Sequence, residues 1–218
     1  MVNKITLIYV YDPLCGWCFG FHPVVQKIKK RFNGQMNLEV KPGGLAIGEG
    51  AGPISEHFSD LHSALNQVEK RTGAEFGKNF RLLAEEGSYH FNSEPPCRAQ
   101  VAVNMISPDH ALDFAGKLHH AIFAEGKNLN QADTYPELIE EFDIDPDRFM
   151  ELFKSDKTAK ILQEEIRWSR ESGATGFPAL LIRIGDQTSL MTRGYRPFDT
   201  IESHLHHLIN NLEKISKA

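Results

Sequence analysis

The stretch from residue 5 to residue 18 reads Ile-Thr-Leu-Ile-Tyr-Val-Tyr-Asp-Pro-Leu-Cys-Gly-Trp-Cys. Its first seven residues form a continuous apolar, β-rich run, which is typical of a buried central strand. Residues 17–32 carry apolar side chains near helical spacing, so we expect a helix to begin at the Cys-Gly-Trp-Cys motif. A cysteine pair in this position lies among unsatisfied backbone N-H groups, at the positive end of the helix dipole.

This placement favours disulfide exchange chemistry. Thiolate is the species that attacks disulfides, and helix N-termini lower the cysteine pKa from roughly 8.5 to about 3.5–7.5. The other interpretation is half of a structural zinc site, which normally needs four ligands, but the only other cysteine is Cys97. We therefore interpret Cys15 as the nucleophile and Cys18 as the thiol that resolves the mixed disulfide.

The composition is that of a globular protein, with 41% hydrophobic and 24% charged residues. A formal net charge of −5 argues against a nucleic-acid or anionic-membrane surface. No apolar run approaches the roughly 18 residues of a membrane span, and no signal-peptide cleavage site follows the first strand. Without a recognised export signal we expect a cytoplasmic protein in a reducing compartment. Since three cysteines cannot form a closed set of structural disulfides, we expect the pair to be catalytic or redox-sensing.

The pattern after the motif predicts a strand, a helix and a second strand near residues 38–40, which together make a βαβ unit. Residues 43–53 are rich in glycine and are interpreted as a linker. No convincing strand follows for a long stretch, and apolar stripes at helical spacing predict helices instead. One of these stripes extends from Ile54 to Val68.

Strand signals return near the end of the chain. The predicted elements there are a helix, two strands around a Gly185-Asp186 turn and an amphipathic helix, at about residues 158–171, 179–184, 188–192 and 197–215. This order indicates a split α/β domain with a helical insertion. The expected boundaries are 1–48 and 156–218 for the split domain and 49–155 for the inserted all-helical domain.

Three motifs resemble the DsbA-like branch of the thioredoxin superfamily and together span nearly the whole chain. Residues 12–18 are similar to the Asp-x-x-Cys-Pro-Trp-Cys of cytoplasmic, FrnE-type members. Residues 173–179, Gly-Ala-Thr-Gly-Phe-Pro-Ala, resemble the segment that places a cis proline opposite the cysteines. Residues 92–98, Asn-Ser-Glu-Pro-Pro-Cys-Arg, are more weakly similar to the start of a helix in the insertion.

The resemblance implies an α/β protein with a thioredoxin-like fold and an inserted all-helical domain. It also implies a cis Phe177-Pro178 bond, although an X-Pro bond is cis in only about 5–6% of cases. The exposed backbone of Phe177 would then pair with an incoming peptide as an extra strand. We assign substrate binding to Gly16, Trp17, Phe177 and Pro178, with Trp17 as a partly exposed wall of the site.

The chain also departs from the family pattern. Gly16 stands where FrnE-type members commonly have proline, and we expect a more flexible loop there. Tyr9 occupies the position at which many thioredoxins carry a buried acid, so Asp12 is the nearest carboxylate. Asp12 has two interpretations. It is a proton relay for Cys18, or it is the opening residue of an Asp-Pro turn, which the sequence slightly favours.

Two further residues are candidate modulators of the cysteine pair. His22 follows Cys18 by four residues on the same helix face, although a histidine on the helix surface is the more ordinary interpretation. Cys97 is expected in the first turn of an insertion helix, where it is either a buried small hydrophobe or a third redox thiol.

Taken as a sequence, the chain is expected to be a thiol-disulfide oxidoreductase, a protein disulfide reductase or isomerase acting on disulfide-containing proteins or small thiols. No metal and no cofactor are expected, with glutathione as a candidate co-substrate. One rival function is a glutathione-dependent transferase or isomerase of the kappa or hydroxychromene carboxylate isomerase type, which typically has serine at the active position. The other is a non-catalytic metal-binding or scaffold protein.

Overall fold

A computed structural model describes residues 5–58 and 60–217. Residues 1–4, 59 and 218, which the expected domain boundaries include, lie outside the described part. The helices and strands follow in the order β1 (Ile5–Tyr11), α1 (Gly16–Arg31), β2 (Met36–Pro42), β3 (Gly52–Pro53), α2 (Ile54–His57), α3 (Leu61–Thr72), α4 (Lys78–Glu86), β4 (His90–Phe91), α5 (Glu94–Ile106), α6 (Ala111–Phe123), α7 (Tyr135–Ile139), α8 (Pro146–Lys154), α9 (Asp156–Glu171), β5 (Ala179–Ile184), β6 (Gln187–Arg193) and α10 (Phe198–Lys217).

The four long strands form one sheet in the order β2-β1-β5-β6. Strand β1 pairs in parallel with β2, as a βαβ unit requires, and antiparallel with β5. The expected hairpin is confirmed, because β5 and β6 pair antiparallel around Gly185 and Asp186. All seven residues of β1 are buried, in agreement with the apolar run that predicted a central strand.

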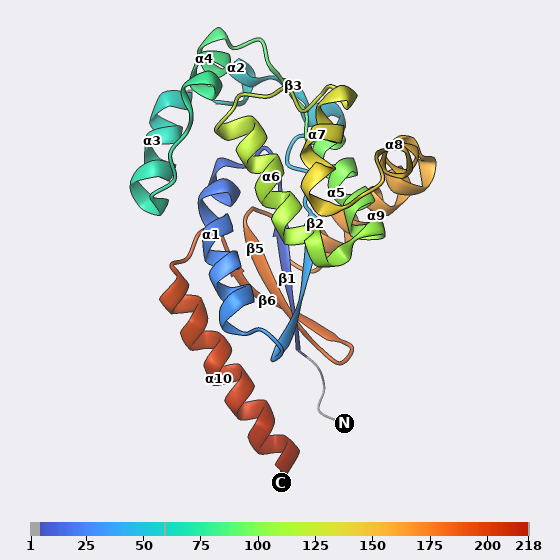
Figure 1. Cartoon of the computed structure of the whole chain (residues 1–218). Coiled ribbons are helices and arrows are strands. Elements are labelled where there is room, and N and C mark those ends of the chain that lie inside the picture. Colours follow the sequence, from blue (N-terminus) through green and yellow to red (C-terminus); the bar gives the residue numbers. More distant parts are fainter. Residues whose placement is uncertain (1–4, 59, 218) are drawn as a thin grey trace.

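Alternate residues of β1 face opposite sides of the sheet. On one side Leu7 packs in a cluster with Val25 of α1 and Leu205 of α10. On the other side Ile8 packs in a cluster that includes Trp168 of α9. Figure 1 shows α1 and α10 together on one side of the sheet, and the helices of the insertion gathered at the end of the sheet where α1 begins. The fold is thioredoxin-like with a helical insertion, as expected.

The insertion has its own apolar core and differs from the expectation in two places. Strands β3 and β4 pair antiparallel, so the insertion is not wholly helical. Strands of two residues are too short to show an alternating pattern in the sequence. The stripe from Ile54 to Val68 is also not one helix, because Phe58 is extended and Asp60 caps a new helix by accepting a hydrogen bond from Ser63 N at 2.9 Å.

Candidate redox site

The first cysteine of the pair lies at the N-cap of α1. Its backbone is extended, and its Sγ accepts a hydrogen bond from the N-H of Cys18 at 3.4 Å. The Cys15 Sγ therefore lies at the N-terminal end of the helix, beside the backbone N-H groups of its first turn. Cys15 is 7% exposed, whereas Cys18 has no exposed surface.

The second cysteine lies inside the first turn and is fully buried. Burial raises the pKa of the Cys18 thiol well above its usual value, and the neighbouring Cys15 raises it further. Both thiols are free in this structure. Tyr9, which stands at the position of the usual buried acid, donates a hydrogen bond to the main-chain oxygen of Cys18 at 3.4 Å. The two cysteines thus differ in access in the direction expected for an attacking and a resolving thiol.

Asp12 is fully buried between β1 and α1 and holds several segments together. One carboxylate oxygen accepts hydrogen bonds from Leu14 N and Ser93 Oγ, both at 2.9 Å, and the other accepts one from Leu45 N at 2.7 Å. The bond to Leu14 N is the turn interaction that the sequence suggested. Burial raises the pKa of Asp12, while the hydrogen bonds from Leu45, Leu14 and Ser93 lower it.

Cys97 lies in the first turn of α5, as expected, and is fully buried. Its Sγ donates to the second carboxylate oxygen of Asp12 at 3.7 Å. Burial raises the pKa of the Cys97 thiol well above its usual value, and the charge of Asp12 adds to this. The third thiol is therefore a buried partner of Asp12, and its redox role stays a prediction.

The interpretation of His22 as a surface histidine is wrong. His22 is only 7% exposed, because α6 of the insertion covers this face of α1, with Gly116 directly over the ring. Burial lowers the pKa of His22 to about 4. A second buried histidine, His119 of α6, lies with its ring centroid 6.0 Å away and donates from Nε2 to the main-chain oxygen of Asp12 at 3.1 Å. Burial lowers the pKa of His119 to about 3.

The Phe177-Pro178 peptide bond is cis, as the resemblance implied. The main-chain oxygen of Phe177 lies 3.9 Å from Cys15 Sγ, so the two segments meet although they are far apart in the sequence. Gly43, in the expected linker, makes this approach possible: a Cβ there would lie 2.0 Å from the Phe177 ring. The linker thus supports the site rather than merely connecting domains.

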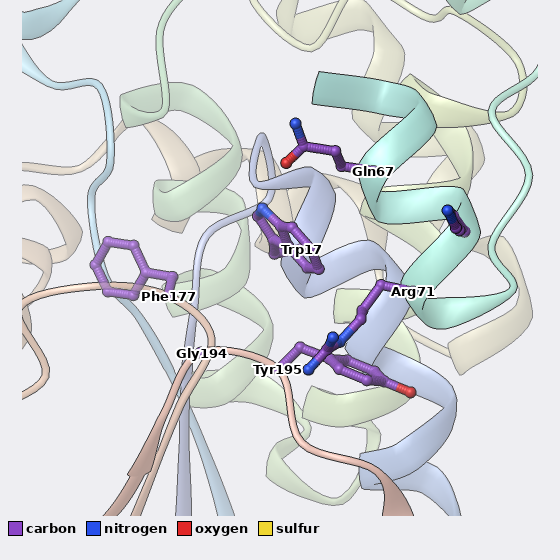
Figure 2. A pocket seen from close by; sticks show the side chains of 7 residues that line it. Trp17, Gln67, Arg71, Phe177, Gly194 and Tyr195 are labelled. Atoms are coloured by element: carbon purple, nitrogen blue, oxygen red, sulfur yellow. The ribbon is translucent and has the colours of Figure 1, made fainter. Parts of the chain in front are cut away.

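Gly16 and Trp17 both contact the insertion. A Cβ on Gly16 would lie 3.1 Å from the Phe76 ring, which gives a packing reason for the absence of a side chain. Trp17 is partly exposed, as expected for a wall of the site, and borders a cavity of about 730 Å³. Figure 2 shows Trp17 in the middle of this cavity, with Phe177 on one side and α3 on the other. The residues lining it are Trp17, Gln67, Lys70, Arg71, Phe177, Gly194 and Tyr195.

Sequence reasoning missed the residues that α3, α6 and the β6–α10 connection bring to the site. Lys70, Arg71 and His119 belong to the insertion, and Tyr195 follows β6. The only sequence signal for Lys70 and Arg71 was that they form a basic pair after an apolar stripe at helical spacing. Such a pair is equally typical of an ordinary helix end. In the described ranges 5–58 and 60–217, no group of three or more His, Cys, Asp or Glu residues is arranged to hold a metal ion. None of the helices in these ranges has the length and apolarity to cross a membrane.

A family model described as the DSBA-like thioredoxin domain matches residues 6–206. The chain belongs to this family. The match covers β1, the cysteine pair, the insertion and the cis-proline segment, so the DsbA-like domain accounts for both the sheet and the inserted helices.

Solved structures of similar fold include proteins with several functions. A Nitrosomonas europaea protein, proposed to be a protein disulfide isomerase, is 26% identical, with a TM-score of 0.84, and the match covers 95% of this chain and 98% of that one. The cytosolic disulfide reductase DsbM from Pseudomonas aeruginosa is 24% identical, with a TM-score of 0.72, covering 86% of this chain and 89% of DsbM. DsbM solved with GSH matches with a TM-score of 0.71 and 23% identity over the same shares of the two chains.

Two further matches have names that describe other functions. A 2-hydroxychromene-2-carboxylate isomerase is 15% identical, with a TM-score of 0.64, covering 96% of this chain and 98% of the isomerase. The ClpXP adapter protein SpxH of Bacillus subtilis (strain 168) is 20% identical over 226 residues, which cover 99% of this chain and 72% of SpxH. The TM-score of the isomerase shows a common fold, and the activity of this chain has to be inferred from the residues of its own site.

Proposed function

We propose that the protein is a cytoplasmic thiol-disulfide oxidoreductase that reduces or isomerises disulfides with the Cys15-Cys18 couple. The observation that carries this proposal is the arrangement of two free thiols, one at the N-cap of α1 facing the cis-proline segment and one buried behind it. The names of DsbM and of the N. europaea protein support the reaction class, and that of DsbM supports the cytoplasmic location.

In the proposed reaction the thiolate of Cys15 attacks one sulfur of a substrate disulfide. A new S–S bond forms to Cys15, the substrate bond breaks, and the leaving sulfur takes a proton. Cys18 then loses its proton and attacks Cys15 Sγ, which releases the second substrate thiol and leaves the enzyme as a disulfide. Two molecules of a thiol such as glutathione reduce the enzyme again and leave as one disulfide, so that electrons balance.

The raised pKa of Cys18 has a consequence for this sequence of steps. A buried thiol that holds its proton does not compete with Cys15 for the substrate. It becomes a nucleophile only when a mixed disulfide has formed next to it and its proton has been removed. The main-chain oxygen of Phe177, close to Cys15 Sγ, is where the backbone of a bound substrate would be aligned.

Serine variants of the cysteines test the proposal. We expect Cys15→Ser to abolish reduction of insulin disulfides with glutathione as electron source, and Cys18→Ser to accumulate mixed disulfides that mass spectrometry detects. Cys97→Ser is the third variant of the series, because its Sγ contacts Asp12 and its redox role is open: retained turnover would exclude a third redox thiol, and loss of turnover would support one. In the reduced wild type, iodoacetamide should modify Cys15 before Cys18. Faster modification of Cys18 would reverse the two roles.

The glutathione-dependent transferase or isomerase has the common fold in its favour. It predicts conjugation or isomerisation of small electrophiles that survives Cys18→Ser, because a single thiolate or hydroxyl then suffices. Glutathione-dependent turnover without disulfide reduction would establish this rival. The metal-binding or scaffold alternative predicts zinc in the purified protein or no turnover in either assay.

A further inference from the structure

The cavity beside Trp17 has an unusual balance of charge. Its two charged lining residues, Lys70 and Arg71, are both cationic and both exposed. The one acidic residue within α3, Glu69, is engaged elsewhere: it lies 2.6 Å from the Arg81 guanidinium and accepts a hydrogen bond from Phe76 N. Among the described residues no carboxylate forms an ion pair with Lys70 or Arg71. Both cationic groups can therefore interact with an anionic ligand.

The cavity also adjoins the nucleophile. Trp17 follows Cys15 by two residues, and Phe177, on the opposite side in Figure 2, places its main-chain oxygen 3.9 Å from Cys15 Sγ. A disulfide attacked by Cys15 therefore has its flanking atoms in or next to this space. A volume of about 730 Å³ is within the range of ligand sites, which is roughly 300–1,000 Å³.

We propose that this cavity binds the part of a disulfide substrate next to the attacked sulfur, and that Lys70 and Arg71 select substrates with a carboxylate there. The inference rests on the proposed disulfide chemistry and adds a substrate class to it. In peptides and in small cysteine-containing thiols, the anion close to the sulfur is a carboxylate. Two sources share this chemistry, an acidic residue beside a peptide cysteine and the carboxylates of glutathione.

The other lining residues fit such a ligand. Trp17 and Tyr195 provide apolar ring surface for the carbon atoms, while the Gln67 amide and the Tyr195 hydroxyl can form hydrogen bonds to a peptide backbone. Figure 2 shows Arg71 extending from α3 toward Tyr195. Because the whole chain carries a net charge of −5, a local pair of cations offsets part of the repulsion that an acidic substrate would meet at this cavity.

Charge reversal in α3 tests the inference. The substrates are three disulfide peptides that differ only in a Glu, Gln or Lys next to the cysteine, and glutathione disulfide. We expect the reduced wild type to react with the Glu peptide about three- to tenfold faster than with the Lys peptide in 20 mM salt, and less selectively in 500 mM salt. Lys70→Glu/Arg71→Glu should reverse this order.

Two further variants serve as controls for net charge and for helix stability. Lys157→Glu/Lys160→Glu makes the same change in net charge at exposed positions of α9, outside the cavity, and should preserve the order of the wild type. Lys70→Gln/Arg71→Gln, which adds no negative charge to the last turn of α3, should abolish the preference without reversing it.

The results separate the inference from the function on which it rests. Equal rates for the Glu and Lys peptides together with no effect of charge reversal on glutathione disulfide would overturn the inference, while the Gln peptide still reports disulfide reduction. A loss of preference in the α9 control as large as in the α3 variant would overturn it as well. If the wild type reduces no peptide and no glutathione disulfide, the proposed function is wrong and the inference with it. A charge effect on glutathione disulfide with equal rates for the peptides would overturn selection of acidic peptides and leave glutathione as the source of the carboxylate.

Discussion

Asp12 and the two buried histidines show how single residues set the surroundings of the cysteine pair. The carboxylate of Asp12 ties the end of β1 to Leu45, Ser93 and Cys97, while its main-chain oxygen accepts from His119. The Nδ1 atoms of His22 and His119 find no hydrogen-bond partner among the described residues. Protonating either ring would therefore place an unpaired charge in the interior next to the site.

The burial of these histidines predicts a loss of stability in acid. The native pKa values of His22 and His119 are about 4 and 3, below the usual value of about 6.5. At pH values between the native and the unfolded pKa, the unfolded chain binds protons that the native protein does not. The contribution of these histidines to the free energy of unfolding is therefore fully present above about pH 6.5 and decreases as the pH falls. We expect the free energy of unfolding in urea to fall between pH 7 and pH 5 in the wild type. In His22→Gln this fall should be smaller by about 1–2 kcal/mol.

Comparing the variant with the wild type cancels the contributions of the other titrating groups to the pH dependence of stability. Asp12 and Glu165, whose pKa values burial raises, contribute with the opposite sign, but they do so equally in wild type and variant. His62→Gln, at an exposed position of α3, is the control and should keep the pH dependence of the wild type. An identical pH dependence in His22→Gln and wild type would show that His22 titrates as an exposed side chain.

At the scale of elements, the site depends on short connections that approach each other closely. The segment after β2 and the segment before β5 meet where the Phe177 ring covers Gly43. Gly43 N also donates to the main-chain oxygen of Tyr11 at 2.7 Å, which fixes the segment against the end of β1. The position of Phe177 next to Cys15 is therefore set by the packing of two loops, neither of which has regular secondary structure.

Adding one methyl group at this contact should impair activity. In Gly43→Ala the new Cβ would lie 2.0 Å from the Phe177 ring, so Phe177 must move away from its place beside Cys15. We expect kcat/KM for disulfide reduction to fall by about tenfold, equivalent to about 1.4 kcal/mol, with an unchanged far-UV circular dichroism spectrum. Gly50→Ala is the matched control, because a Cβ there has open space, and its kcat/KM should equal that of the wild type. Equal turnover in Gly43→Ala and Gly50→Ala would contradict this role.

At the scale of the whole molecule, the insertion and the sheet share buried polar contacts. Tyr11 of β1 donates to Gln100 of α5 at 2.5 Å, and Gln100 donates to Asn104 and to the main-chain oxygen of Ala111. Asn104 in turn donates to the main-chain oxygen of Val40 in β2. Helix α6 contributes apolar residues to both large cores. We infer that the two parts unfold as one unit.

Removing the centre of this polar chain should destabilise the whole protein. Gln100→Ala leaves the buried Tyr11 hydroxyl without its acceptor, which we expect to cost about 2–4 kcal/mol in the free energy of unfolding. Gln131→Ala, at an exposed position, should change it by less than about 0.5 kcal/mol. Urea unfolding followed by circular dichroism and by tryptophan fluorescence measures both. Two separate transitions in the wild type would show that the insertion and the sheet unfold independently.

The sequence alone determined the features that depend on neighbouring residues. The apolar run of β1, the cysteine pair at the start of α1, the β5–β6 hairpin and the amphipathic α10 all follow from local patterns. The DsbA-like fold and the cis bond before Pro178 followed from the resemblance of short motifs. The break between α2 and α3 was missed, because an apolar stripe keeps the same spacing whether its helix is continuous or capped and restarted.

Only the tertiary structure decided which distant residues surround the cysteines. Whether His22 faces solvent depends on α6, which lies about a hundred residues further along the chain, and no property of α1 reports the presence of that cover. The same holds for the contact of Asp12 with Cys97 and for the cations that α3 places beside Trp17. Helical spacing specifies which side chains share a face, but the partner of that face is chosen by packing over the whole chain, where burial and hydrogen bonding between remote segments are settled together.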